Sequence, residues 1–499
     1  MHLCLEPMSI FSKNSSTEQK VNTMAIYPKY DPKTIQSELR DILPEEALCT
    51  SYFERINNAL DPYTSSDIIT QEQVPYVVVR PGSTTEVSLI MKYANEKKIP
   101  VFVRGSGTSL HGASKYRHAG IVISTRRLNH IRIEKDNNYA EFGPGHRVLE
   151  LKKIFEKEGY FLPLVPGSIR VASVGGMITN NSSAHAVDSC MGKTRDRVLG
   201  LEVVLPTGEV IETGTKSLRR PAGTDLTQYF VGGDGLLGVI TGIRMQLVPM
   251  FCSAYGVAYF SDEITAAKAV QRIYLEKAPV PLFLEYLDKR VAKIAYKIQN
   301  LPEPVGSLVM FHAIGQTDEE ATYKINRLVE TIQKESIIEA HRIEDLDEWH
   351  KIWLARESAL PYICQGGKGQ FGLSEIVSTV RDLDKCMEDT KNMYKGMPTL
   401  EKLGEPYIMG HIGALTFHPV YIFPADWSPE EKAKGINEMF IKEGEINMRY
   451  GTVGGEWGQF AKRTDFYKER YGNDVYRLVK NIKKVFDPNN ILNPDIFRD

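Results

Sequence analysis

Val103–Gly112, VRGSGTSLHG, is a glycine-rich loop that directly follows the β-rich run Ile99–Val103. Its glycines allow several backbone N–H groups to point into one concavity, because glycine adopts positive φ and carries no Cβ. Such a nest binds an anion. A second glycine-rich stretch, PGSIRVASVGGMITNNSSA, follows at Pro166–Ala184. Two loops of this kind predict one long cofactor that carries phosphate groups.

Two common phosphate-binding motifs do not match these loops. A dinucleotide fingerprint that starts at Gly105 requires glycine where the chain has Leu110, and the acidic residue about 20 positions later is not evident. Gly192-Lys193-Thr194 ends like a P-loop, but the first glycine of that motif falls on Val187. The sequence therefore argues against the Rossmann and P-loop readings.

Four ordered blocks carry a family resemblance. They are VVVRPGSTTEVSLIMKYANEKKIPVFVRGSGTSLHGA (Val77–Ala113), PGSIRVASVGGMITNNSS (from Pro166), VLGLEVVLPTGEVIETG (Val198–Gly214) and DLTQYFVGGDGLLGVITGIRMQLVP (Asp225–Pro249). Together they resemble the FAD-binding domain of the vanillyl-alcohol oxidase and p-cresol methylhydroxylase superfamily. The similarity is to its branch of D-lactate dehydrogenases, glycolate oxidase flavin subunits and D-2-hydroxyglutarate dehydrogenases.

The resemblance implies both a fold and a cofactor. The expected fold class is α+β, with a two-subdomain FAD-binding domain of the p-cresol methylhydroxylase type and a ferredoxin-like antiparallel-sheet cap. Relatives that tether FAD covalently have histidine where this chain has Thr108, so we expect a dissociable FAD, with His111 as a neighbour only. The residues expected to bind FAD are Arg104, Gly105, Ser106, Gly107, Thr108, Ser109, Pro166, Gly167, Ser168, Ser173, Gly175, Gly176, Asn180, Gly238 and Ile240.

Composition fits a large flavoenzyme of several domains. At 499 residues, of which 42% are hydrophobic, the chain exceeds a single core. Its 61 basic and 63 acidic residues leave no global basic field for nucleic acid or an anionic membrane. The six cysteines form no C-x-x-C pair for zinc, an iron–sulfur cluster or a dithiol. No secretion signal or run of about 18 apolar residues is visible, so we expect a cytoplasmic protein.

Hydrophobic periodicity predicts alternating helices and strands. We expect residues 1–27 to be disordered, 28–250 to bind FAD, 251–445 to form the cap and substrate domain, and 446–499 to return to the FAD domain. The expected helices are Thr84–Glu96, Val148–Glu158, Ile264–Lys277 and Glu319–Lys334, with a closing helix from Val479. The expected strands are Ile99–Val103, Ile121–Ser124, Tyr139–Phe142, Leu201–Leu205, Ala254–Phe260, Leu282–Asp288 and Ser307–Gly315.

The candidate catalytic histidines lie in GHIGALTFHP, Gly410–Pro419. His411 and His418 are separated by an odd number of positions, so the loop between them must curve if their imidazoles converge. In the family that the chain resembles, such a pair joins the glutamate of an E-H-G motif at a divalent metal, and Glu456 matches that glutamate. We therefore regard His411, His418 and Glu456 as candidate ligands of a metal such as zinc, and hydrogen-bonded structural histidines as the alternative.

Two departures from the family alter this site. The histidine that follows the glutamate in relatives is Trp457 here, and an indole cannot accept a proton. The family's G-D-G-N is Gly413–Thr416, GALT, which replaces an amide and a carboxylate with other groups. Phe417, Tyr421 and Trp457 suit an apolar or aromatic substrate, and Tyr421 is a candidate catalytic group if that substrate is a phenol.

Arg356 is the candidate residue for binding a substrate carboxylate. Trp353–Glu357, WLARE, is similar to the W-x-x-R-E segment whose arginine pairs with the substrate in hydroxy-acid dehydrogenases. Guanidinium geometry suits this bidentate contact. The alternative is an arginine that serves only in a surface ion pair.

Two functions remain open. The first is an FAD-dependent dehydrogenase or oxidase of a 2-hydroxy acid or related secondary alcohol, supported by Arg356 and the His411, His418 and Glu456 set. The second is a 4-alkylphenol or aryl-alcohol oxidoreductase, supported by Trp457. An alkylglycerone-phosphate synthase is disfavoured, because the chain has no run of adjacent histidines. The expected partners are a small-molecule substrate and an electron acceptor such as oxygen, a quinone or a partner protein, with a homodimer left open.

Overall fold

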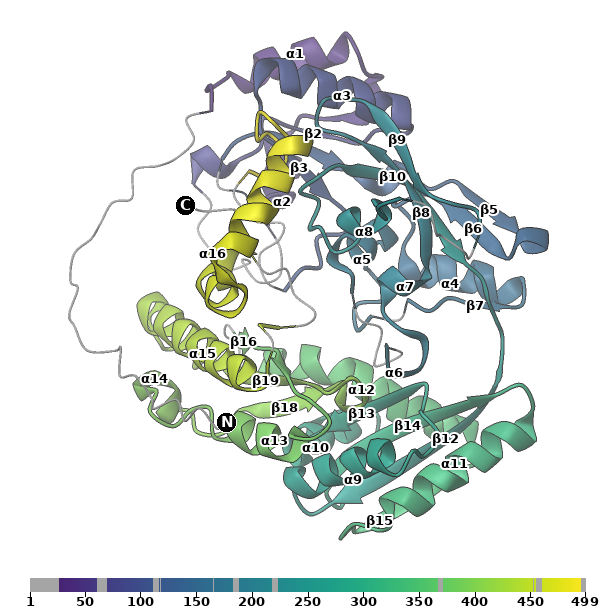
Figure 1. Ribbon diagram of the computed structural model, residues 1–499. Coiled ribbons are helices and arrows are strands. Elements are labelled where there is room, and N and C mark those ends of the chain that lie inside the picture. Colours follow the sequence, from purple (N-terminus) through teal and green to yellow (C-terminus); the bar gives the residue numbers. More distant parts are fainter. Residues whose placement is uncertain are drawn as a thin grey trace.

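The structure is a computed structural model that describes residues 27–60, 70–110, 116, 118–164, 166–182, 188–217, 223–366, 371–451, 453–454 and 460–494. The expected disordered segment up to residue 26 lies outside this range, as do His111, Glu456 and Trp457. The described residues form two parts built around sheets, with a long C-terminal helix between them (Figure 1). This mixed architecture confirms the α+β class.

The first part contains two main sheets. A four-stranded sheet has the order β1-β2-β4-β3, with β4 parallel to both of its neighbours. A five-stranded antiparallel sheet has the order β5-β6-β10-β8-β9, and β7 pairs with β11. Their bounds are β1 Leu48–Cys49, β2 Val77–Val79, β3 Val101–Arg104, β4 Ile121–Ser124, β5 Ile131–Glu134, β6 Tyr139–Phe142, β7 Tyr160–Phe161, β8 Val198–Val204, β9 Val210–Gly214, β10 Val239–Gln246 and β11 Val248–Pro249.

Helix α3 (Thr84–Lys97) illustrates how the sequence forms this part. Ser83 caps its N-terminus by accepting a hydrogen bond from the Glu86 N–H, and Lys98 ends it in the left-handed region. Its apolar face is buried, and strand β3 follows and leads into the glycine loop. The other helices of this part are α1 Pro32–Arg40, α2 Tyr52–Asn57, α4 Val148–Lys157, α5 Val174–Asn180, α6 Asp188–Met191, α7 Thr194–Arg197 and α8 Thr227–Phe230.

The second part is centred on a larger antiparallel sheet, which is the expected cap. Its strand order is β15-β12-β14-β13-β18-β19-β16, and β17 pairs with β19 beside that path. Long registers join β12 to β14 and β14 to β13. The strands are β12 Cys252–Phe260, β13 Phe283–Leu287, β14 Ser307–Gly315, β15 Glu339–Ile343, β16 Phe371–Leu373, β17 Ile376–Val377, β18 Tyr407–Gly410 and β19 Thr416–Ile422.

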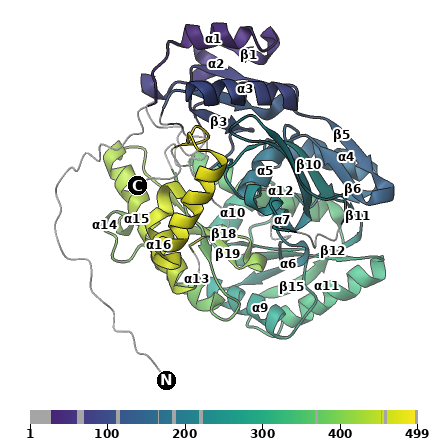
Figure 2. The ribbon, with the colours of Figure 1, turned by 45° about the horizontal axis from the view of Figure 1, so that its top comes forward.

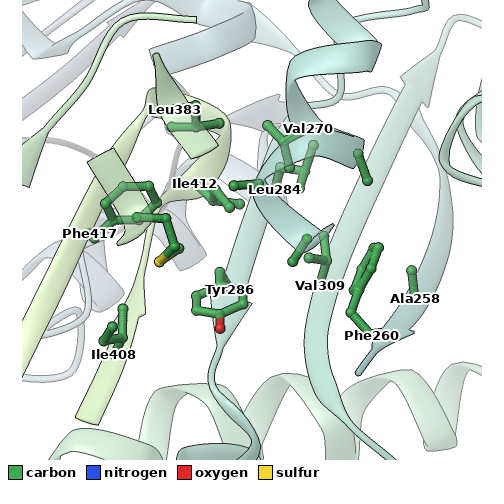
Figure 3. Packing of buried hydrophobic residues seen from close by; sticks show 14 of the residues in the cluster. Ala258, Phe260, Val270, Leu284, Tyr286, Val309, Leu383, Ile408, Ile412 and Phe417 are labelled. Atoms are coloured by element: carbon green, nitrogen blue, oxygen red, sulfur yellow. The ribbon is translucent and has the colours of Figure 1, made fainter. Parts of the chain in front are cut away.

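Helices cover both faces of the cap sheet. Helices α9, α11 and α13 pack on one face around the first cap cluster, which includes Ala266, Val270, Leu284, Tyr286, Ile325 and Phe417 (Figure 3). Helices α10 and α12 cover the other face around the second cap cluster, which includes Phe283, Leu287, Val291, Ile352, Ala355, Met409 and Val420. The helices are α9 Glu263–Leu275, α10 Lys289–Ile298, α11 Asp318–Ile332, α12 Leu346–Gly366, α13 Leu383–Lys391, α14 Pro398–Glu401 and α15 Pro429–Arg449.

Helix α16 (Phe460–Phe486) leads the chain from the cap back to the first part (Figures 1 and 2). Near its end, the buried Lys483 ammonium donates to the carbonyl oxygen of Leu236 at 3.0 Å and pairs with Asp487. The Val101 N–H then donates to the Ile491 carbonyl at 2.7 Å, beside the four-stranded sheet. None of the helices in the described residues is long and apolar enough to cross a membrane.

Candidate functional site

The two glycine-rich loops meet in the structure. The Ser106 N–H donates to Ser173 Oγ at 3.2 Å, which joins the first loop to the start of α5. A Cβ on Gly105 would lie 2.0 Å from the same Oγ, so a side chain at that position would displace the Ser173 hydroxyl and break this contact. Gly107 has φ +68°, a backbone conformation that favours glycine. The loops therefore form one close-packed backbone cradle.

Arg104 adds a buried positive charge beside this cradle. Its Nη2 donates to the Leu60 carbonyl oxygen at 2.7 Å. Its Nη1 is buried and has no hydrogen-bond partner among the described residues. A buried guanidinium N–H is costly unless it finds an acceptor, and phosphate oxygens are strong acceptors. The cradle and Arg104 together fit a cofactor that carries a pyrophosphate, such as FAD.

The other expected FAD residues divide into open and packed positions. A Cβ on Gly176 would meet only Ser173 Oγ, at 3.2 Å, so this glycine borders open space. By contrast, a Cβ on Gly175 would lie 2.5 Å from the Cβ of Pro144, and one on Gly238 would lie 2.4 Å from Val203 Cγ1. Glycine is therefore required at these two positions for packing.

The remaining positions near the loops have local roles. Ile240 is buried in the core of the first part. Pro166, Gly167 and Ser168 begin a turn in which the Ile169 N–H donates to the Pro166 carbonyl at 2.9 Å. Asn180 Nδ2 donates to Ser182 Oγ at 3.3 Å. Thr108 and Ser109 lie partly buried in the first loop.

A charged cluster lies within the cap on the face that α12 covers. Strand β13 alternates, so that Leu284 and Tyr286 enter the first cap cluster while Phe283 and Leu287 enter the second. Glu285 therefore points towards α12, and Arg356 of α12 meets it there. His411, which directly follows β18, completes the group, and we call Glu285, Arg356 and His411 the Glu285 cluster.

The contacts in the Glu285 cluster are short and shielded from solvent. Arg356 Nε and Nη2 both lie 2.7 Å from Glu285 Oε2. The other carboxylate oxygen, Oε1, lies 2.7 Å from His411 Nδ1. Glu285, Arg356 and His411 are 0%, 5% and 8% exposed. Arg356 has five N–H donors, of which this ion pair uses two, so its other edge is available for a second carboxylate.

The two histidines converge, as their spacing allowed. Strands β18 and β19 pair so that Met409 faces His418, and the 3₁₀ turn Ile412–Ala414 curves the connection. Leu415 ends that turn with φ +60°. The ring centroids of His411 and His418 lie 5.3 Å apart, with the rings nearly perpendicular. His418 Nδ1 lies 3.4 Å from the carbonyl oxygen of Ser374.

Buried acidic residues that no sequence motif marked lie beside this hairpin. Glu285 is the only charged residue in the strand Phe283–Leu287, whose residues are all buried. That pattern was a usable signal, because buried carboxylates need a partner. Glu443 of α15 accepts a hydrogen bond from Ser374 Oγ at 3.1 Å, and Glu375 beside it is fully buried. Nothing in the sequence pattern links α15 to the histidines.

The predicted aromatic residues Phe417 and Tyr421 lie on one face of β19, and His418 lies on the other. Successive side chains of a strand point to opposite faces, and Phe417 and Tyr421 both enter the first cap cluster. Figure 3 shows Phe417 among the apolar residues of that cluster. His418 and Val420 point the other way, and Val420 belongs to the second cap cluster. The structure therefore does not bring Tyr421 to the histidines.

Two of the three residues expected to bind a metal, His411 and His418, belong to the described part of the chain. Within the part of the chain that the structure describes, no group of three His, Cys, Asp or Glu side chains could hold a metal ion. His411 and His418 are close together, and Glu456 lies outside the described residues. The described residues thus do not make a complete metal site.

An uncharged histidine lines the same face of the cap sheet. His312 on β14 faces Phe283 across the strand pair, and its ring lies 5.0 Å from that ring and 4.7 Å from Tyr255. Burial lowers the pKa of His312 to about 3, because the apolar surroundings disfavour the charged imidazole. His312 is therefore a neutral part of the apolar wall.

Residues in and beside the glycine loops contact the part of the cap that also contains the Glu285 cluster. Leu110, at the end of the described part of the first loop, packs against the second cap cluster. Met191 of α6 is buried in that same cluster. Arg170, which follows the Pro166 turn, lies 3.9 Å from Glu357 of α12. A cofactor held by the loops would therefore border the cap face that carries Arg356 and His411.

Comparison with known proteins identifies the family. Residues 75–214 match the family described as FAD binding domain, and residues 252–496 match the C-terminal domain of FAD linked oxidases. A mitochondrial D-lactate dehydrogenase (cytochrome) of Arabidopsis thaliana is 30% identical over 93% of this chain and 80% of its own length. The chain belongs to the FAD-linked oxidase family.

Two further relatives of this FAD-linked oxidoreductase are also named for the oxidation of a 2-hydroxy acid. The glycolate oxidase subunit GlcD of Bacillus subtilis is 28% identical over 85% of this chain and 89% of its own length. A D-lactate dehydrogenase of Archaeoglobus fulgidus is 28% identical over 89% and 98%. The chain is thus an FAD-linked oxidase or dehydrogenase related to enzymes that act on 2-hydroxy acids.

Solved structures confirm the fold. The chain superposes on p-cresol methylhydroxylase with a TM-score of 0.75 at 16% identity, over 94% of this chain and 97% of the other. The 4-ethylphenol oxidase of Gulosibacter chungangensis gives a TM-score of 0.75 at 19% identity, over 95% and 98%. At these identities the likeness establishes the FAD-binding fold with its cap, as the sequence analysis expected.

Proposed function

We propose that this FAD-linked oxidoreductase is a dehydrogenase of a small 2-hydroxy acid. The observation that carries the proposal is the Glu285 cluster, in which one carboxylate contacts both a guanidinium and an imidazole. The substrate of such an enzyme carries a carboxylate and a hydroxyl on adjacent carbons. Arg356 matches the substrate carboxylate, and His411 matches the hydroxyl.

Arg356 binds the substrate carboxylate in this proposal. Glu285 holds the Nε and Nη2 edge of the guanidinium, which leaves the Nη1 side for a second anion. The ion pair also offsets the charge of Arg356, so a carboxylate that enters meets an oriented donor in a site screened from water. An uncharged alcohol has no carboxylate to pair with Arg356. The enzyme should therefore select hydroxy acids over simple alcohols.

His411 and His418 handle the substrate hydroxyl. The alcohol proton must leave as the carbon is oxidised, and an imidazole is an effective acceptor near neutral pH. The chemistry that FAD supplies when bound is acceptance of two electrons as a hydride. The proposal includes a divalent metal at His411, His418 and Glu456, which would bind the hydroxyl and ease the loss of its proton. With that metal bound, the two imidazoles would act as its ligands and not as proton acceptors.

FAD is proposed to be dissociable. The support is Thr108, which stands where relatives with tethered flavin have histidine, together with the cradle at Gly105 and Ser173. Acid or heat denaturation should release intact FAD into the supernatant. Flavin fluorescence that stays with the precipitated chain would contradict this part of the proposal.

Anaerobic flavin bleaching tests the main proposal. The holoenzyme is mixed with D-lactate, glycolate, D-2-hydroxyglutarate or a 4-alkylphenol, and flavin absorbance is followed. Bleaching by a 2-hydroxy acid and not by the phenol is the expected result. A phenol is the less favoured substrate, because Tyr421 lies in the first cap cluster, away from His418. Bleaching by the phenol alone would overturn the proposal.

A further inference from the structure

We infer that Glu285 is a positioning residue that sets the tautomer of His411 and the orientation of Arg356 with a single carboxylate. The three side chains come from strand β13, helix α12 and the end of strand β18, far apart in the sequence. The role of His411 in the reaction rests on the proposed function. The tautomer itself does not.

The contact with Arg356 sets the charge state of Glu285. Arg356 directs two N–H groups, from Nε and Nη2, at the same oxygen, Oε2, at 2.7 Å each. A guanidinium in proteins is always protonated, so this contact favours the ionised carboxylate. An ionised carboxylate only accepts hydrogen bonds.

The ionised Glu285 in turn fixes the position of the hydrogen on His411. Because Glu285 Oε1 only accepts, the Nδ1 atom at 2.7 Å must donate and therefore carries a hydrogen. A neutral imidazole has one N–H, so its lone pair is then on Nε2. The lone pair on Nε2 is what a proton acceptor or a metal ligand requires.

The Glu285 carboxylate has little freedom to turn away from Arg356 and His411. Glu285 is fully buried, and both of its strand neighbours, Leu284 and Tyr286, are locked in the first cap cluster. Rotation would leave Arg356 as an uncompensated charge in the protein interior, which is costly. One buried group thus holds a proton-accepting imidazole and a carboxylate-binding guanidinium at a constant separation, which pre-organises both for one substrate.

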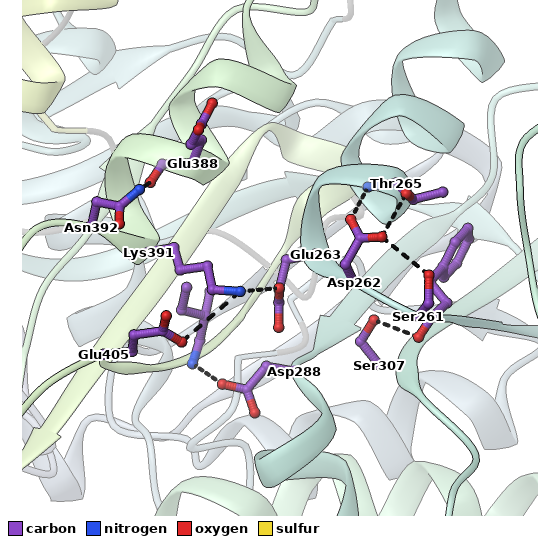
Figure 4. Close-up of polar contacts among 12 residues, drawn as sticks. Ser261, Asp262, Glu263, Thr265, Asp288, Ser307, Glu388, Lys391, Asn392 and Glu405 are labelled. Carbon is purple, nitrogen blue, oxygen red and sulfur yellow. Dashed lines mark hydrogen bonds and ion pairs between the residues drawn. The ribbon is translucent and has the colours of Figure 1, made fainter.

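Asp288 provides a matched control on the same segment. It is also a buried acid, three positions further on, and it accepts hydrogen bonds from the backbone N–H groups of Val291 and Ile408 at 2.7 Å each. Figure 4 shows it beside the ion pairs that Lys391 makes with Glu263 and Glu405. These contacts stabilise the start of α10, so loss of the Asp288 charge should not change His411.

Nitrogen-15 NMR of histidine-labelled holoenzyme tests the inference without turnover. The His411 signals are assigned from their loss in His411→Asn, and spectra are recorded near pH 9, well above the ordinary imidazole pKa of about 6.5. The wild type should show protonated Nδ1 and unprotonated Nε2. In Glu285→Gln, the amide oxygen faces Arg356 and its NH₂ faces His411, so the hydrogen should move to Nε2. Asp288→Asn should leave the wild-type pattern unchanged.

Each outcome decides the inference. A wild-type His411 with its hydrogen on Nε2 would overturn it, and so would an unchanged tautomer in Glu285→Gln. If Glu285→Gln does not fold, the pair Glu285→Leu with Arg356→Met removes both charges together, and His411 should then lose its fixed Nδ1–H tautomer. Retention of that tautomer in the double variant would also refute the inference.

Flavin reduction adds a kinetic readout. Glu285→Gln should slow reduction by a 2-hydroxy acid about 10- to 100-fold, as expected when an outer partner of a functional histidine is lost. If no 2-hydroxy acid reduces the wild-type flavin, the proposed function fails while the NMR result still decides the role of Glu285. Normal reduction rates together with a shifted tautomer would remove His411 from the reaction.

Discussion

Replacement of Arg356 separates its structural role from its role in substrate binding. In Arg356→Met the side chain keeps its bulk, but Glu285 becomes a buried carboxylate without its guanidinium partner. In Arg356→Lys the positive charge remains, but the two parallel N–H groups that hold Oε2 are lost. The first variant tests the buried ion pair, and the second tests bidentate geometry.

The magnitudes follow from burial. Both partners of the pair are almost completely shielded from water, and breaking such a pair by removing one partner costs about 3–5 kcal/mol. For a part of this size, Arg356→Met should lower the apparent melting temperature by roughly 10 °C. Arg356→Lys should lower it less. Loss of a charged hydrogen bond to substrate, about 1.5–3 kcal/mol, should reduce kcat/KM about 10- to 150-fold in Arg356→Lys.

Thermal melts of the holoenzyme and stopped-flow flavin reduction measure the two effects. Equal melting temperatures for wild type and Arg356→Met would refute the buried ion pair as described. Unchanged kcat/KM in a folded Arg356→Lys would refute Arg356 as the carboxylate-binding residue and would favour a substrate without a carboxylate.

Three further predictions concern the cofactor, the metal and pH. Gly176→Leu should lower the amount of bound flavin, measured as the ratio of absorbance at about 450 nm to that at 280 nm. It should not greatly lower stability, because the leucine side chain would point into open space beside Ser173. Full flavin content in this variant would contradict the assignment of the loop. Elemental analysis of protein purified without chelators should find about one divalent metal ion per chain. Both His411→Ala and His418→Ala should lose this metal. A wild-type protein that is active without metal and insensitive to chelators would rule the metal out. Burial lowers the pKa of His312 to about 3, below the value of about 6.5 in the unfolded chain. The neutral, buried His312 therefore contributes fully to the free energy of unfolding above about pH 6.5. This contribution is lost as the pH falls towards 3, by about 1.4 kcal/mol per pH unit. His312→Phe should therefore be less sensitive to acid than wild type in urea unfolding at pH 7 and pH 4.5, and an equal loss in both proteins would contradict the buried neutral state.

Local pattern was enough to predict the elements near the cofactor. The periodicity of Thr84–Glu96 and the β-rich run before Gly105 correspond to helix α3 and strand β3. Strand β14 has the predicted bounds, Ser307–Gly315. These features depend on neighbouring residues, because helix caps, strand alternation and the φ of glycine are set within a few positions of the chain.

The sequence also indicated the odd spacing of His411 and His418 and the need for a curved loop between them. It did not indicate how far helix α16 extends. The predicted closing helix begins at Val479, whereas the helix in the structure begins at Phe460. It grouped Phe417 and Tyr421 with the histidines, whereas strand alternation directs them to the opposite face of β19. These aromatic residues share strand β19 with His418, but the face on which each lies was decided by which helices cover each side of the sheet.

What the sequence by itself determined, then, was the family, the glycine loops and the chemical types available near the C-terminal half. The tertiary structure alone decided which of those groups meet. Glu285 and Arg356 are 71 positions apart, and Glu285 and His411 are 126 apart, so no local pattern could pair them. They meet because β13, β18 and α12 bury their apolar faces in one cluster. A charge enclosed in that cluster is stable only against an opposite charge or a hydrogen-bond donor.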